Sequence, residues 1–516
     1  MFQRIRSSIV VTSAAFGCML AASVAEAATC ESLASMKLAN GTITMAQPVA
    51  AGAFTPPAGR GGREGRGGGA TQFASLPAFC RVAATLTPTK DSDIKMEVWL
   101  PSSGWNGKFI MVGNGGWNGS ITYAPPGPTM GEMLERGYAV ASTDTGHTGG
   151  GGDWMQNKEK LVDYGHRAVH ETTVKAKAIV NAFYDSAPKF SYFNGCSAGG
   201  RQGLKAALQY PDDFDGIVAG APALNATGRA AFAVYVAQNL RKEAGSMIPA
   251  SKYPAINNAV LMACDANDGV KDGVIENPRS CKFDAKVLAC TAAESDSCLT
   301  PPQVEAANKM YQAVKNPRTS KEIFPGLSYG SELGWGTFGA QQPFAVATQM
   351  FQFMVFKDPA WDYKTLNFDT HMAQVDAIEN GVINALDPNL KPFASSKGKM
   401  IMYHGWADPQ IPAESSVGYY TRVIDAMGGA SKAKENVRLY MVPGMNHCGQ
   451  GVGTSTFDML AALEQWVESN KAPDSIPASK VTQGKTERTR PLCAYPQVAT
   501  YKGSGSTDEA ANFSCK

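Results

Sequence analysis

The eleven residues FSYFNGCSAGG at positions 190–200 decide the fold. Residues 190–194 form a short aromatic and apolar run, which predicts a buried strand. The next five residues, Gly195-Cys196-Ser197-Ala198-Gly199, have the spacing Gly-x-Ser-x-Gly, and residues 199–209 read as a helix. A serine flanked by these glycines, after a strand and before a helix, is typical of a nucleophile elbow, whose strained turn projects the serine side chain.

The sequence around this elbow predicts an α/β-hydrolase core. From residue 108 onward, short apolar runs alternate with amphipathic stretches, as expected of a parallel sheet with crossover helices. Residues 165–183 read as another helix. The other expected strands are 108–113, 138–143, 215–220, 399–404 and 437–442.

Residues 225–393 interrupt this alternation. The segment contains four cysteines, many prolines and many aromatic residues, and its helical stretches have a different pattern. We therefore expect a catalytic domain made of residues 28–224 and 394–516, with 225–393 as a large inserted lid domain. An insertion between late strands would cover the carboxyl ends of the sheet, where open α/β folds bind ligands.

Composition favours a small-molecule substrate as the partner. Hydrophobic residues make up 44% of the chain and charged residues 18%, as in ordinary globular proteins. Lys+Arg 47 against Asp+Glu 45 gives a net charge of +2, which offers no electrostatic reason to bind nucleic acid or an anionic membrane. No obligate protein partner is evident, and no redox cofactor is implied.

The N-terminus predicts export. Residues 1–27 combine Arg4 and Arg6, an apolar stretch and Ala25-Glu26-Ala27, as a secretory signal peptide does. We expect a periplasmic or extracellular protein without a transmembrane anchor. Residues 59–69, GRGGREGRGGG, read as a mobile loop. Its arginines would suit an anionic partner, but a loop that only connects its neighbours is the favoured interpretation.

The position of the elbow predicts its catalytic partners. A serine hydroxyl needs a histidine to take its proton and a carboxylate to orient that histidine. In α/β hydrolases the chain order is serine, acid, histidine. Asp408 and His447 each follow one of the last two expected strands, whereas His371 falls in the lid and His404 within a strand. The predicted triad is Ser197, Asp408 and His447.

Two backbone amides are expected to stabilise the oxyanion of such a reaction. One is the N–H of Ala198, directly after the nucleophile, and the other belongs to the glycine loop GNGGW at 113–117, where we favour Gly116. A purely structural glycine turn is the alternative for that loop.

The cysteines predict a bridge at the site. Cys196 precedes Ser197 and Cys448 follows His447, so that converging catalytic residues would bring these cysteines toward the Cα separation of about 5.5 Å that a disulfide needs. A catalytic thiol at Cys196 is the rival interpretation, but the elbow projects only its central side chain. Without Cys18 of the signal, ten cysteines remain, enough for five disulfides.

The stretch DANDGVKDGV at 265–274 predicts a calcium loop in the lid. Ca²⁺ prefers six to eight oxygen ligands, and alternating oxygens with glycine turns suit it. The predicted ligands are the carboxylates of Asp265, Asp268 and Asp272 and the carbonyls of Val270 and Val274. The glutamate that closes an EF-hand loop is absent, and a turn without a cation is the alternative.

Together, GCSAGGRQG, HGWADPQIP, GMNHC, GNGGW and CDANDGVKDGVI resemble the tannase/feruloyl esterase family over nearly the whole mature chain. The Cys-Ser and His-Cys dipeptides are the most specific of these features. The resemblance implies the same triad, the Cys196–Cys448 bridge and calcium in the lid. It also implies four further bridges: Cys30–Cys80, Cys264–Cys281, Cys290–Cys298 and Cys493–Cys515.

The expected function is a two-step hydrolysis of aromatic carboxylic esters, because members of that family cleave feruloyl or galloyl esters. Trp406 and Trp117 are expected to flank the substrate ring, whereas Trp361 is expected in the core. The family resembled also includes mono(2-hydroxyethyl) terephthalate hydrolases, but the lid here is shorter. A terephthalate mono-ester hydrolase, an amidase or peptidase with the same triad, and a non-catalytic calcium-dependent binding protein are the alternatives.

Overall fold

A computed structural model of the chain describes residues 1, 29–57, 70–117, 119–125 and 127–516. Apart from Met1, the expected signal segment 1–27 lies outside the described residues, and so does the Gly/Arg-rich stretch 59–69. No described helix combines the length and apolar character needed to span a membrane.

The centre of the molecule is a nine-stranded mixed sheet in the order β1-β2-β3-β5-β4-β6-β7-β10-β11. The pairs β1–β2, β2–β3 and β3–β5 are antiparallel. From β5 to β11, every neighbouring pair in this order is parallel. The strands are β1 (Gly41–Val49), β2 (Phe79–Leu86), β3 (Ile94–Pro101), β4 (Lys108–Val112), β5 (Ala139–Thr143), β6 (Phe190–Cys196), β7 (Gly216–Gly220), β10 (Lys399–Gly405) and β11 (Val437–Val442).

The parallel strands are mostly apolar because both faces of the sheet are covered. In β4, Phe109 and Met111 pack into the core on one face, while Ile110 and Val112 pack into the core on the other. The core on the Phe109 face also contains side chains of α3 (Ala168–Tyr184), α4 (Ala198–Gln209) and α12 (Glu414–Met427). The core on the Ile110 face contains side chains of α1 (Met130–Glu135) and α14 (Met459–Ser469). The remaining helices of this part are α2 (Lys158–Val162) and α13 (Ala430–Lys434). Hence the α/β-hydrolase core predicted from the sequence is confirmed, and the six expected strands are present with small shifts of their ends.

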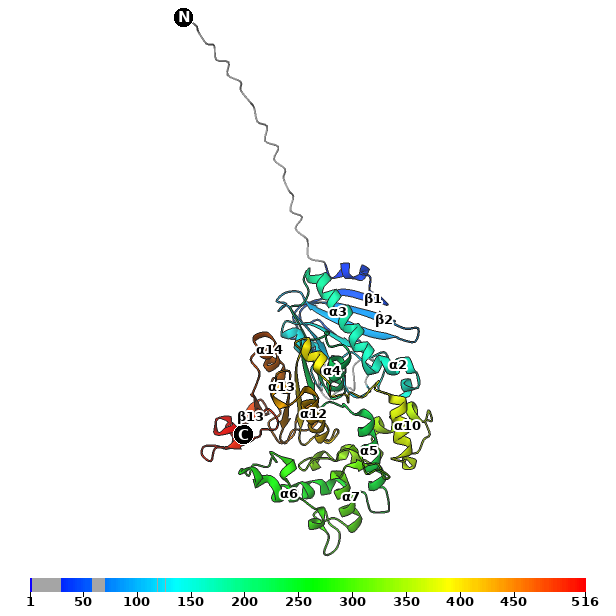
Figure 1. The fold of residues 1–516 in the computed structure, drawn as a ribbon, viewed down its shortest axis with the longest axis vertical. Coiled ribbons are helices and arrows are strands. Elements are labelled where there is room, and N and C mark those ends of the chain that lie inside the picture. The colour runs from blue at the N-terminus through cyan, green and yellow to red at the C-terminus, as the bar shows by residue number, and fades with distance from the viewer. Residues whose placement is uncertain (2–28, 58–69, 118, 126) are drawn as a thin grey trace.

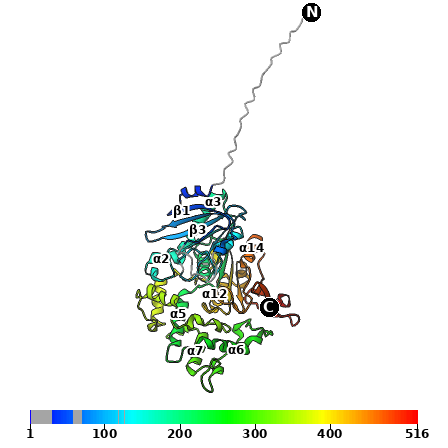
Figure 2. The ribbon, with the colours of Figure 1, turned by 180° about the vertical axis from the view of Figure 1, so that it is seen from behind.

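The segment between β7 and β10, which we predict to be the lid, is mainly helical and has an apolar cluster largely of its own, including Phe232, Trp335 and Phe351. Figures 1 and 2 show α5, α6 and α7 together at the end of the molecule opposite β1. Its elements are α5 (Ala226–Leu240), α6 (Tyr253–Cys264), α7 (Pro301–Tyr311), β8 (Val314–Lys315), β9 (Glu322–Phe324), α8 (Gly336–Gly339), α9 (Ala345–Gln349), α10 (Thr370–Glu379) and α11 (Lys391–Ser395).

Two small hairpins end the chain, β12 (Ser475–Thr482) with β13 (Lys485–Cys493) and β14 (Ala499–Tyr501) with β15 (Phe513–Cys515). Arg490 of β13 reaches the inserted segment and donates to Asp272 at 2.7 Å. The ten cysteines expected to bridge form five disulfides, and the pairs are those implied by the family resemblance.

A buried ion pair joins the antiparallel strands β2 and β3. Arg81 and Glu97 are 8% and 3% exposed, and Arg81 Nε donates to Glu97 Oε2 at 2.9 Å. Trp99 Nε1 donates to the same oxygen at 2.9 Å, and the Tyr123 hydroxyl donates to Glu97 Oε1 at 2.5 Å. The buried carboxylate therefore has three hydrogen-bond partners, and it neutralises the arginine.

Replacing Glu97 by glutamine is expected to destabilise the fold by about 3–5 kcal/mol, because it leaves Arg81 buried without a counter-charge. The measurement is the free energy of unfolding in urea. The control is Glu305→Gln, since Glu305 pairs with Lys242 at 3.2 Å on the surface and such pairs contribute less than about 1 kcal/mol. Equal losses in both variants would contradict the assigned importance of the buried pair.

Candidate active site

The strained turn between β6 and α4 carries Ser197. Its backbone angles are φ 65° and ψ −121°, a combination that residues other than glycine rarely adopt. The Ser197 N–H donates to the Gly220 carbonyl at 2.9 Å, and its own carbonyl accepts from the Ala223 N–H at 3.0 Å. A Cβ on Gly195 would lie 2.7 Å from the Gly199 carbonyl carbon, so the turn closes only with glycine there.

Asp408 and His447 are in direct contact. Asp408 follows β10 and is 1% exposed, and its Oδ2 lies 2.6 Å from His447 Nδ1. An ionised carboxylate only accepts hydrogen bonds, so Nδ1 carries the hydrogen and the Nε2 lone pair of the imidazole stays free to accept a proton. This is the tautomer that a general base requires.

A second histidine, which the sequence prediction set aside, also binds Asp408. His404 is fully buried, with Nε2 3.1 Å from Asp408 Oδ2 and Nδ1 2.8 Å from Ser416 Oγ. The sequence predicts only that His404 lies within a strand. Its position four residues before Asp408 in HGWAD was the signal that could have identified it.

Asp408 is held by four donors. Besides the two histidines, the backbone N–H groups of Gln410 and Ile411 donate to Oδ1 at 2.8 and 2.9 Å. Burial by itself raises the pKa of a carboxyl, but the charge of His447 and the hydrogen bonds from His404 and His447 outweigh it. The pKa of Asp408 therefore lies well below its usual range, and the group stays ionised.

The Cys196–Cys448 disulfide brings the serine and histidine loops together. Its S–S distance is 2.04 Å and the two Cα atoms are 5.9 Å apart, although the cysteines are 252 positions apart in sequence. Cys196 thus has no thiol with which to act as a nucleophile. The Ser197 hydroxyl makes no hydrogen bond to the described residues, as is common for catalytic groups without substrate.

The predicted oxyanion loop packs against the start of α4. Asn114 N–H donates to Gln202 Oε1 at 3.0 Å, and the Gln202 amide donates to Asn114 Oδ1 at 3.1 Å. The Tyr164 hydroxyl donates to the Gly116 carbonyl at 2.8 Å. Within the described part of the chain, the Ala198 and Gly116 N–H groups form no hydrogen bond, so both remain available to a ligand.

The tryptophans differ in their placement. Trp117 is 4% exposed, and its indole N–H donates to the Val346 carbonyl at 3.0 Å. Trp361, predicted to lie in the core, is only partly buried, and it stacks on Phe356 at 5.0 Å between ring centroids beside the apolar cluster of the inserted segment. Trp406 lies in the wall of a cavity, and none of the three predicted triad residues lines that cavity.

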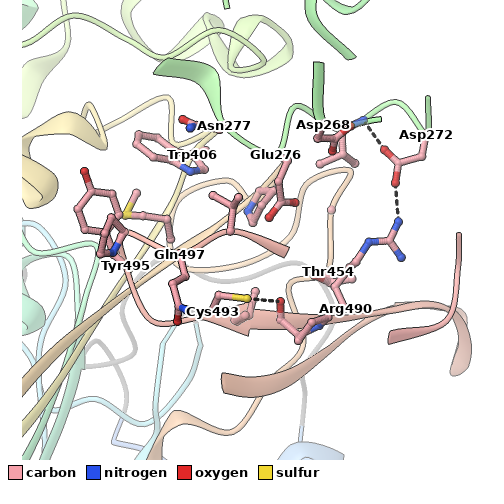
Figure 3. A pocket seen from close by; sticks show the side chains of 18 of the residues that line it. Asp268, Asp272, Glu276, Asn277, Trp406, Thr454, Arg490, Cys493, Tyr495 and Gln497 are labelled. Carbon is pink, nitrogen blue, oxygen red and sulfur yellow. Dashed lines mark hydrogen bonds and ion pairs between the residues drawn. The ribbon is translucent and has the colours of Figure 1, made fainter. Parts of the chain in front are cut away.

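This cavity, of about 220 Å³, lies between the predicted calcium loop and the C-terminal strands. Figure 3 shows Trp406 and Tyr495 toward one end of it, Asp272 and Arg490 toward the other, and Glu276 between them. Burial raises the pKa of Glu276 to about 8, and the nearby charges of Asp268 and Asp272 add to the effect.

The predicted calcium loop gathers carboxylates, but their oxygens already have partners. Asp265 accepts from the Asp272 and Gly273 N–H groups at 3.3 and 3.0 Å, and Asp268 accepts from Val270 N–H at 2.9 Å. Asp272 pairs with Arg490 at 2.7 Å and Arg488 at 3.1 Å.

Among the residues that the structure describes, no group of three or more histidine, cysteine, aspartate or glutamate side chains is arranged to hold a metal ion. Even so, burial raises the pKa of Asp268, and the charges of Asp272 and Asp265 raise it further. Repulsion of this kind between oxygen donors is what a bound divalent cation would relieve.

Comparison with known proteins identifies the family. The sequence model of the tannase and feruloyl esterase family matches residues 80–516. An uncharacterized esterase of Xanthomonas campestris pv. campestris is 38% identical, with 98% of this chain and 94% of that protein aligned. A probable feruloyl esterase B-1 of Aspergillus oryzae is 35% identical, over 86% of this chain and 85% of its own length.

Solved structures agree with this result. The crystal structure of feruloyl esterase B from Aspergillus oryzae superposes with a TM-score of 0.87 at 32% sequence identity, covering 94% of this chain and 99% of that one. The chain belongs to the tannase and feruloyl esterase family, and it is a carboxylic ester hydrolase with an α/β-hydrolase fold.

Proposed function

We propose that the protein is an exported serine esterase that hydrolyses esters of aromatic carboxylic acids, of the feruloyl or galloyl type, through an acyl-enzyme. Relatives named as feruloyl esterases support the substrate class. The observation that carries the mechanism is the 2.6 Å contact between His447 and Asp408, with His447 tied by the Cys196–Cys448 bridge to the loop of Ser197. Five disulfides agree with export to an oxidising compartment.

In the proposed reaction, Ser197 Oγ attacks the ester carbonyl carbon while His447 Nε2 takes the hydroxyl proton. The N–H groups of Ala198 and Gly116 stabilise the oxyanion of the tetrahedral intermediate, and the alcohol leaves with the proton from His447. Water then attacks the acyl-enzyme in the same way and releases the aromatic acid. Asp408 stays ionised throughout and stabilises the imidazolium that forms in each step.

A bound calcium ion is a second element of the proposal. Asp265, Asp268 and Asp272 would hold it through carboxylates, and Val270 and Val274 through backbone carbonyls. The ion would supply positive charge to this acidic loop. Arg490 already links the loop to the C-terminal hairpin, so the expected role is in stability.

Ser197→Ala is expected to lower kcat on methyl ferulate by about four to six orders of magnitude, as removal of a nucleophile does in serine hydrolases. A fluorophosphonate probe should label the wild type at Ser197 and leave the variant unlabelled. The control is Ser186→Ala, because Ser186 is an exposed serine bonded only to the neighbouring Ala187 carbonyl. Labelling at another residue, or full activity of Ser197→Ala, would refute the serine mechanism.

The double variant Cys196→Ala/Cys448→Ala is expected to lose roughly 100-fold in kcat, because loosening the two loops misplaces the base relative to the nucleophile. Initial rates should be compared at a temperature where circular dichroism shows both proteins folded. Cys290→Ala/Cys298→Ala is the matched control, since it removes a disulfide from the inserted segment. Wild-type rates in the first double variant would show that the bridge does not position the catalytic pair.

Removing calcium with a chelator is expected to lower Tm by about 3 °C, because a ligand at about 100 times its Kd adds roughly 2.7 kcal/mol to stability and the unfolding entropy of a chain of this length is large. In Asp268→Ala, calcium should no longer change the Tm. Asp296→Ala provides the comparison, since Asp296 is an exposed aspartate elsewhere in the inserted segment. An identical Tm with calcium and with chelator in the wild type would exclude the site.

A further inference from the structure

Arg229, on α5, is a buried cation without a counter-ion. The residue is 7% exposed, and its Nε has no hydrogen-bond partner. No hydrogen bond or ion pair within the described part of the chain uses its guanidinium, which lies over the ring of Phe344 at 5.2 Å. Burying an unpaired charge is costly, so proteins seldom keep one without a purpose.

The topology places Arg229 beside the catalytic residues. β7 lies between β6, which leads to Ser197, and β10, which leads to Asp408. The loop after β7 contacts the nucleophile, because the Ala223 N–H donates to the Ser197 carbonyl, and α5 starts directly after this loop. Arg229 belongs to the first turn of α5, where its N–H donates to the Asn225 carbonyl at 3.0 Å.

The charged groups near Arg229 do not neutralise it. Burial lowers the pKa of its guanidinium to about 10, and the nearby Tyr164 and Asp408 only partly oppose this. Asp408 is already bound by two histidines and two backbone amides, and the Tyr164 hydroxyl donates to Gly116. The N-terminal end of α5 adds positive potential of its own.

Two other buried arginines of this chain have hydrogen-bond partners for their guanidinium groups, although Arg201 Nη2 has none among the described residues. Arg201 is 1% exposed, and its Nη1 donates to the Gly165 and Ile383 carbonyls at 3.1 Å each. Arg81 forms its ion pair with Glu97. These two arginines bind groups of the protein, whereas the guanidinium of Arg229 has no hydrogen-bond partner among the described residues.

We propose that Arg229 binds a carboxylate of the substrate, so that the preferred esters are aromatic esters carrying a second, free carboxylate. This inference rests on the proposed esterase function and narrows its substrate class. The planar guanidinium fork matches a carboxylate through two parallel hydrogen bonds, which are strong where water is excluded. A carboxylate on the acyl ring and a carboxylate on the alcohol group can each accept these two hydrogen bonds.

Two matched pairs of esters separate these sources. Monomethyl and dimethyl terephthalate differ by a carboxylate on the acyl ring, and chlorogenic acid and its methyl ester differ by one on the alcohol. The quantity to measure is the ratio of kcat/KM for the charged ester to that for the neutral ester. Comparing each ratio between wild type and variant cancels the intrinsic reactivities of the esters.

Arg229→Gln is expected to lower this ratio by roughly 10- to 100-fold for at least one pair, because a hydrogen-bonded charge is lost only for the charged ester. Arg422→Gln should leave it unchanged, since Arg422 is an exposed arginine that lies over the Tyr419 ring at 5.7 Å on α12. If the ratio falls only for the terephthalate pair, the bound carboxylate is on the acyl ring; if it falls only for the chlorogenic acid pair, the carboxylate is on the alcohol. Unchanged ratios for both pairs would overturn the proposal.

Calorimetry with Ser197→Ala tests the same inference without an arginine variant. Charged esters of at least one pair should bind about tenfold or more tightly than their neutral partners. Equal affinities within both pairs would overturn the role of Arg229 even if Arg229→Gln failed to fold. A wild type that hydrolyses none of the four esters would instead contradict the proposed esterase function, and the binding comparison would still decide on Arg229.

Discussion

The buried carboxylate of Asp408 is the group on which the site depends. It is removed from water, so it can remain ionised only because four donors surround it. One donor is His447, whose tautomer and direction are fixed by that contact. Another is His404, which α12 anchors through Ser416. The orientation of the proposed base thus depends in part on the hydrogen bond that joins His404 of β10 to Ser416 of α12.

The order of the strands explains why distant residues meet. β6, β7, β10 and β11 are neighbours in the sheet, and they run in parallel, so their carboxyl ends share one edge. Ser197 follows β6, α5 follows β7, Asp408 follows β10 and His447 comes after β11. The Cys196–Cys448 bond then joins the first and last of these loops across the edge. The covalent link fixes a separation that the sheet alone would leave to flexible loops.

The sequence was most informative where one physical requirement dominates. The central strands were predictable because burial on both faces demands continuous apolar runs, and the elbow because its turn demands glycine. The antiparallel strands β1, β2 and β3 were not predicted, since buried charges such as Arg81 and Glu97 interrupt their apolar pattern. His404 was set aside because a position within a strand does not reveal that its side chain reaches a carboxylate at the strand end.

The burial of Arg229 is the feature that the sequence could least predict. In the sequence it is one arginine in an ordinary helix, and a solvated side chain would be the natural assumption for it. Its burial follows from packing the inserted segment over the sheet, and the lack of a partner is visible only once every neighbour is placed. The core strands therefore fix the positions of the proposed catalytic residues, while the helix that begins the insertion brings a charge next to Asp408. The hydrogen bonds of Asp408 do not involve Arg229, although its charge lies near enough to Asp408 for the two to interact.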